Sequence, residues 1–171
     1  MKAIKNLALV LSLIFAFSAV GFAQNLSFAS LEGENVSIQS QRGKVVILAI
    51  GATWLPLSKN QAIVINRLAK KYAGRDVVVY FVATDSSAAK SKNFASNEDI
   101  QGFATRNKLT ASILRDSDGS GTLKRFKIDQ LPAFIIFDKE GKVAAEPYGG
   151  LTPEQENELV TQISRKIDEL L

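Results

Sequence analysis

Two apolar runs of strand length constrain the fold of this chain more than any other feature. Residues 45–50 and 77–83 are apolar throughout, a pattern typical of strands buried on both faces of a sheet. Between them, from residue 58 to residue 72, apolar side chains recur at helical spacing. A strand, an amphipathic helix and a second strand in this order favour parallel pairing through a right-handed crossover. The sequence therefore predicts an α/β fold with helices packed on a central sheet.

Weaker patterns predict smaller elements around this unit. Residues 131–143 read as a strand, a tight turn at residues 138–141 and a returning strand, with Gly141 supplying the positive φ of the turn. The other expected elements are a peripheral hairpin over residues 28–40, a helix around Ile100 and Phe103, a strand over residues 112–114, a helical piece over residues 123–126, and a last helix with Leu159, Ile163 and Ile167 on its buried face.

The first 23 residues have the pattern of a secretory signal peptide. Lys2 and Lys5 precede an apolar run over residues 7–17, and small residues stand at Gly21 and Ala23. An uncleaved membrane anchor is the alternative, but eleven apolar residues are fewer than the roughly 20 that span a bilayer. We expect a signal peptide over residues 1–23, one domain over residues 24–171, and no stable membrane insertion after cleavage.

The absence of cysteine and histidine excludes several chemistries. The 171 residues include neither amino acid, so disulfides, thiolate metal sites, imidazole bases and histidine zinc sites are all ruled out. Residues 116–120 superficially resemble a calcium-binding loop, but the acid that would complete it downstream is missing, which favours a plain turn. We expect no metal and no cofactor.

The charge balance argues against a nucleic-acid partner. The formal net charge is +4, and removing residues 1–23 takes away two lysines and no acid, which leaves 19 basic and 17 acidic residues. A net charge of +2 on the mature chain is too small to indicate a polyanion partner.

The loop after the first apolar run carries the most specific motif. It reads Ala52-Thr53-Trp54-Leu55-Pro56-Leu57-Ser58-Lys59 and leads into the amphipathic helix. Together with Gly43-Lys44, Leu131-Pro132 and the turn at residues 138–141, this loop resembles the TlpA/ResA-like (AhpC/TSA-redoxin) thiol:disulfide oxidoreductases, over essentially all of residues 26–171. The resemblance implies a thioredoxin-like fold with a central mixed β-sheet flanked by helices, a cis-proline loop at Pro132, and a periplasmic or secreted protein.

The chain departs from this family where the chemistry occurs. Leu55 and Ser58 stand where the family has its two active-site cysteines, and Ala49 replaces a buried polar side chain that assists proton movement. Gln61 and Ile63 replace an acid and a proline often found further along. Leucine has no lone pair, and a serine hydroxyl cannot form a disulfide. We therefore expect no catalytic residue, treat Leu55, Ser58 and Ala49 as degenerate active-site positions, and expect Ser58 to cap the helix that follows.

Two classes of function remain open. The first is a non-catalytic binding module, a pseudoenzyme that holds a protein or an extended peptide on an apolar surface made of Trp54, Leu55, Pro56, Leu57, Leu131 and Pro132. The alternative is a thiol-disulfide oxidoreductase or antioxidant enzyme that acts only with cysteines supplied by a partner, which is chemically poorer because the chain contributes no sulfur. Trp54 fits a partner anchor and a shield for the loop equally well, and a function on an unrelated surface is the third possibility.

Overall fold

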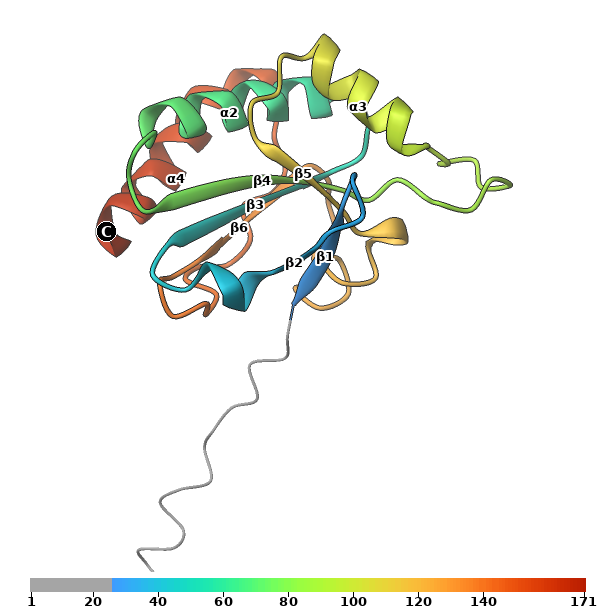
Figure 1. The fold of residues 1–171 in the computed structure, drawn as a ribbon. Coiled ribbons are helices and arrows are strands. Elements are labelled where there is room, and N and C mark those ends of the chain that lie inside the picture. Colours follow the sequence, from blue (N-terminus) through green and yellow to red (C-terminus); the bar gives the residue numbers. More distant parts are fainter. Residues whose placement is uncertain (1–25) are drawn as a thin grey trace, which may run out of the picture.

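The computed structural model describes residues 26–171, so the expected signal peptide lies outside the described residues. One sheet has the strand order β2-β1-β5-β4-β3-β6, and Figure 1 shows it with helices above it. The strands are β1 (Ser27–Ser30), β2 (Asn35–Ser37), β3 (Val45–Gly51), β4 (Val77–Ala83), β5 (Ser112–Arg115) and β6 (Ala133–Phe137). The helices are α2 (Ser58–Lys71), α3 (Asn97–Arg106) and α4 (Glu156–Leu170), with short 3₁₀ turns η2 (Ile38–Gln41), η3 (Ser117–Gly119) and η4 (Pro153–Gln155).

The sheet is mixed, as the sequence predicts. The two apolar runs form β3 and β4, which pair in parallel from Val45 opposite Val77 to Gly51 opposite Ala83. Strand β5 continues the parallel arrangement beside β4, whereas β6 runs antiparallel to β3 and β1 antiparallel to β5. The carboxyl ends of β3 and β4 therefore meet at one edge of the sheet, where the loop at residues 52–57 begins.

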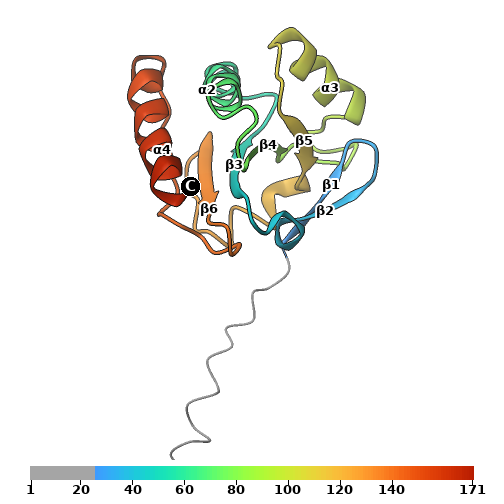
Figure 2. The ribbon, with the colours of Figure 1, turned by 60° about the vertical axis from the view of Figure 1, so that its left-hand side comes forward.

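Two apolar layers cover the sheet, one on each face. The helices α2, α3 and α4 pack on the same face, as Figures 1 and 2 show, and bury residues such as Ile65, Phe103 and Ile163 against β3, β4 and β6. The other face is covered by the N-terminal segment and by turns, through residues such as Phe28 and Ile38. Every residue of β3 is buried as a result, which explains its unbroken apolar sequence.

Most expected elements are confirmed, but the returning strand after residues 138–141 is wrong. Gly141 has the expected positive φ of 80°, yet the chain beyond it makes only isolated bridges, from Val143 to Phe137 and from Tyr148 to Phe134. Pro147 lies between these bridges and has no backbone N–H to continue the ladder. Residues 123–126 likewise form hydrogen-bonded turns and no regular helix.

No helix within residues 26–171 is long and apolar enough to cross a bilayer.

Candidate functional site

The loop between β3 and α2 presents apolar side chains to solvent. Trp54 is 52% exposed, Pro56 is exposed, and Leu55 and Leu57 are half-buried. The loop turns tightly into the helix, since the Leu55 N–H donates to the Ala52 carbonyl and the Ser58 N–H to the Leu55 carbonyl, both at 3.1 Å. We call Trp54, Leu55, Pro56 and Leu57 the loop surface.

A buried carboxylate holds the start of this loop. Asp85 lies two residues after the end of β4 and is fully buried. Its two oxygens each lie 3.0 Å from the Thr53 backbone N, and the Thr53 hydroxyl donates to Oδ1 at 2.6 Å. Hydrogen bonds to an ionised group are shorter and stronger than neutral ones. The sheet therefore positions the loop through a side chain that the neighbouring strand delivers.

Ser58 fixes the other end of the loop, in a way that the sequence did not indicate. Its hydroxyl is buried and donates to the Ala52 carbonyl at 2.7 Å. The expectation that Ser58 caps α2 is wrong, because the N-cap position is Leu57 and no side chain bonds to the helix start there. Ser58 lies inside the first turn, with its hydroxyl turned back to the strand end. Ser58 thus links the end of the loop to its first residue, and its own hydroxyl is not accessible at the surface.

Gln61 is a further buried polar residue, and it links the end of β3 to the start of β6 beneath the loop surface. Its Nε2 donates to the Ile50 carbonyl at 3.0 Å and to the Ala133 carbonyl at 3.2 Å. Its Oε1 has no partner among the residues described, and a side chain at Gly51 would collide with that oxygen. The sequence carried one signal for this role: a glutamine stands four residues before Ile65, on the buried stripe of the helix.

The other part of the expected binding surface, Leu131 and Pro132, is only partly accessible to solvent. The Leu131-Pro132 peptide bond is cis, as the resemblance implies, and Ala133 pairs with Ile50 at the loop's edge of the sheet. Pro132 is itself buried and Leu131 is half-buried. The structure therefore brings both residues to the loop but leaves Leu131 as the one that reaches solvent.

The remaining degenerate position offers no polar group. Ala49 is buried in the middle of β3, between Phe81 of β4 and Phe134 of β6. Its surroundings are apolar, so Ala49 contributes no polar group to the site.

A groove of about 590 Å³ runs along the loop on the side of α3. It is lined by Thr53, Trp54, Leu55, Pro56, Lys59, Phe103, Arg106 and Asn107. The residues of α3 were not anticipated, because nothing in the sequence relates them to a loop some 50 positions earlier. We call this cavity the α3 groove.

No cluster of three potential metal ligands occurs within residues 26–171. In the stretch that resembles a calcium loop, the Asp116 carboxylate accepts the backbone N–H groups of Gly121 and Thr122 at 2.9 and 2.8 Å. The Asp116 carboxylate oxygens therefore stabilise a turn through hydrogen bonds to its backbone.

Comparison with known proteins shows which family this chain belongs to. Residues 20–146 match the model of the AhpC/TSA family. The chain is 28% identical over 142 residues to the thiol-disulfide oxidoreductase ResA of Bacillus thuringiensis subsp. konkukian (strain 97-27), covering 83% of this chain and 76% of that protein. It is 29% identical over 133 residues to the thioredoxin-like protein YneN of Bacillus subtilis (strain 168), covering 78% and 73% of the two chains.

The fold comparison agrees. The structure matches the crystal structure of a thioredoxin-like protein from Aeropyrum pernix with a TM-score of 0.63 at 22% identity, over 81% of this chain and 89% of that one. The family is one of thiol-disulfide oxidoreductases, and this chain holds no cysteine with which to carry out their exchange. The chain belongs to the AhpC/TSA family, as a thioredoxin-like member whose sequence contains no cysteine.

Proposed function

We propose that this protein is an exported, non-catalytic binding module that holds a protein or an extended peptide on its loop surface. The observation that carries the proposal is an exposed apolar loop held in place by buried hydrogen bonds; the motif resemblance puts the family's reactive cysteines in this loop. Export rests on the signal-peptide pattern of residues 1–23.

The anchoring of the loop supports binding on physical grounds. A loop that is already ordered loses little conformational entropy when a partner docks, so more of the contact energy appears as affinity. Asp85 holds Thr53 at the start of the loop, and Ser58 at the end of the loop is tied back to the Ala52 carbonyl through its hydroxyl. Tryptophan is one of the side chains enriched among the energetic anchors of interfaces, and Trp54 is the only tryptophan of the chain.

The alternative, exchange with cysteines supplied entirely by a partner, receives less support. Ser58 is buried and its hydroxyl donates to the Ala52 carbonyl, so the side chain cannot contact the disulfide of a partner protein. Leu55 has no acid, base or nucleophile to contribute. In such an exchange the loop could only hold the partner that carries the cysteines, which is again a binding function.

A capture experiment tests the proposal. The full chain, purified after expression in a bacterium, is compared with Trp54→Asp and with Val143→Asp in pull-downs from an envelope extract. Val143 is a matched control because it is 45% exposed and lies beside Phe137, at the opposite end of β3 and β6 from the loop. We expect wild type and Val143→Asp to capture the same partner and Trp54→Asp to lose it, with all three equally folded by circular dichroism.

Insulin reduction is measured on the same preparations. We expect no turnover above a protein-free control. Turnover by the wild type would contradict the non-catalytic assignment, and capture that survives Trp54→Asp would contradict the loop surface.

A further inference from the structure

The α3 groove has an apolar floor with fixed walls. Trp54, Leu55 and Pro56 form one side, and Phe103 of α3 contributes to the other. Phe103 stacks on Phe81 of β4, with ring centroids 5.7 Å apart. A groove whose sides are tied to the core keeps its shape when empty.

A second contact ties α2 to the chain after α3. The Asn66 side chain donates to the Lys108 carbonyl and accepts the Thr110 N–H, both at 3.0 Å. The two helices that flank the groove are therefore held in a fixed relation.

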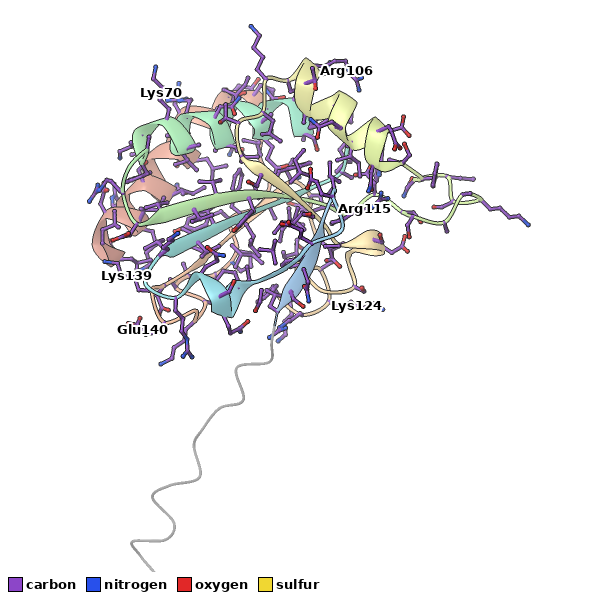
Figure 3. All side chains as sticks on the ribbon, in the orientation of Figure 1. Lys70, Arg106, Arg115, Lys124, Lys139 and Glu140 are labelled. Carbon is purple, nitrogen blue, oxygen red and sulfur yellow. The ribbon has the colours of Figure 1, made fainter. Side chains whose placement is uncertain are left out.

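Two cations line this groove, and neither forms an ion pair within residues 26–171. Lys59 at the start of α2 and Arg106 at the end of α3 are exposed, and Figure 3 shows Arg106 at the outer end of its helix. Neither cation takes part in the ion pairs that Asp168 and Glu169 form within residues 26–171. No acid lines the groove.

The nearest acid along α3 is already engaged. The Asp99 carboxylate accepts the Ser96 backbone N–H at 2.9 Å in a capping box at the start of the helix. This backbone hydrogen bond, followed by the Ser96 hydroxyl, lowers the pKa of Asp99, and Arg106 makes the smallest contribution. The Asp99 carboxylate is thus held mainly by Ser96 and attracts Arg106 only weakly, so both cations of the groove can still meet the carboxylate of a ligand.

We propose that the α3 groove selects a polypeptide segment in which an acidic side chain stands next to an apolar one. The inference rests on the proposed function and names the chemistry of the partner. The apolar side chain contacts Trp54 and Leu55, and the carboxylate lies between Lys59 and Arg106. A polyanion such as nucleic acid fits poorly, because two cations beside an apolar floor neutralise few phosphates and the mature chain has a net charge of only +2.

Selection from a display library of random eight-residue peptides tests this inference. The baits are the full chain, Lys59→Glu/Arg106→Glu, Trp54→Asp, and the control Lys70→Glu/Lys124→Glu, which changes the net charge equally at exposed lysines that Figure 3 shows away from Arg106. We expect wild type and the control to enrich peptides with adjacent acidic and apolar residues. The groove double variant should bind a selected acidic peptide about tenfold more weakly, because it turns two weak surface attractions into repulsions.

The outcomes separate this inference from the function on which it rests. If the groove double variant enriches the same acidic peptides as wild type, the inference is overturned, while loss of enrichment with Trp54→Asp still supports a binding loop. If wild type enriches no peptide above bare matrix, the inference is overturned, and the capture experiment decides the proposed function independently. Enrichment of basic peptides by the groove double variant would support the inference most directly.

Discussion

Replacing Gln61 by glutamate exchanges two buried N–H donors for a carboxyl group that faces two carbonyl oxygens. The amide now donates to the Ile50 and Ala133 carbonyls, and the side chain is fully buried. A carboxylate there would be desolvated and would find no donor, so burial raises the pKa of the introduced carboxyl. The folded protein would hold this group protonated at neutral pH.

The sign and size of the effect follow from linkage. The folded-state pKa lies above the unfolded value of about 4.3, so the charge costs nothing below that pH. As the pH rises, the unfolded chain releases the proton and the folded protein does not, and stability falls by about 1.4 kcal/mol per pH unit until the folded pKa is reached. Relative to wild type, we expect a loss of up to about 4 kcal/mol at pH 7 from this term. A loss of about 1 kcal/mol, independent of pH, comes from the missing second hydrogen bond.

Urea unfolding of the full chain, followed by circular dichroism at pH 4.5 and at pH 7, measures the difference. Gln61→Met is the matched control, because it loses both hydrogen bonds of Gln61 without adding a charge and should be destabilised equally at both pH values. An equal loss of stability for Gln61→Glu at the two pH values would refute the reasoning. It would mean that water reaches the site or that the side chain turns away from Ala133.

Three further predictions concern the loop. Leu55→Cys/Ser58→Cys places both thiols at the family's reactive positions, and we expect a disulfide in air and measurable insulin reduction; free thiols after oxidation, by thiol titration, would argue that the loop geometry has been lost. Ser58→Ala removes one of the two donors to the Ala52 carbonyl, which keeps the Leu55 N–H, and should lower the unfolding free energy by about 1 kcal/mol; a denaturant midpoint equal to that of wild type would count against this. Asp85→Ala should speed amide exchange at Thr53 selectively, because that N–H loses its buried acceptor; unchanged exchange by NMR would show that the loop is held by other contacts.

The sequence predicted the framework well because the strongest patterns came from burial. Residues 45–50 and 77–83 are apolar since β3 and β4 lie between two apolar layers, and no other arrangement buries two such runs joined by an amphipathic helix as simply. The cis bond before Pro132 followed from the motif resemblance. The predicted returning strand is absent because the chain after the turn makes only isolated bridges, and Pro147 has no N–H with which to continue the ladder.

The details of the site were beyond the sequence because they depend on tertiary contacts. A serine at a helix start suggests a cap, but the Ala52 carbonyl lies within reach of Ser58 only after the loop has folded. The wall formed by Phe103 and Arg106 exists because α3 packs beside α2, and no spacing rule links the two helices. Gln61 was the exception, since a polar residue on a buried helical stripe is visible in the sequence.

Photo-crosslinking in intact cells tests the central claim most directly. A photoreactive phenylalanine analogue replaces Trp54 in one protein and Val143 in another, and adducts are compared after irradiation of cells that produce each full chain. A binding loop predicts a discrete adduct from position 54 that is absent from position 143, together with no insulin reduction by the purified wild-type protein. Equal adducts from both positions, or an adduct from position 143 alone, would contradict the assignment of the loop surface as the place where a partner docks.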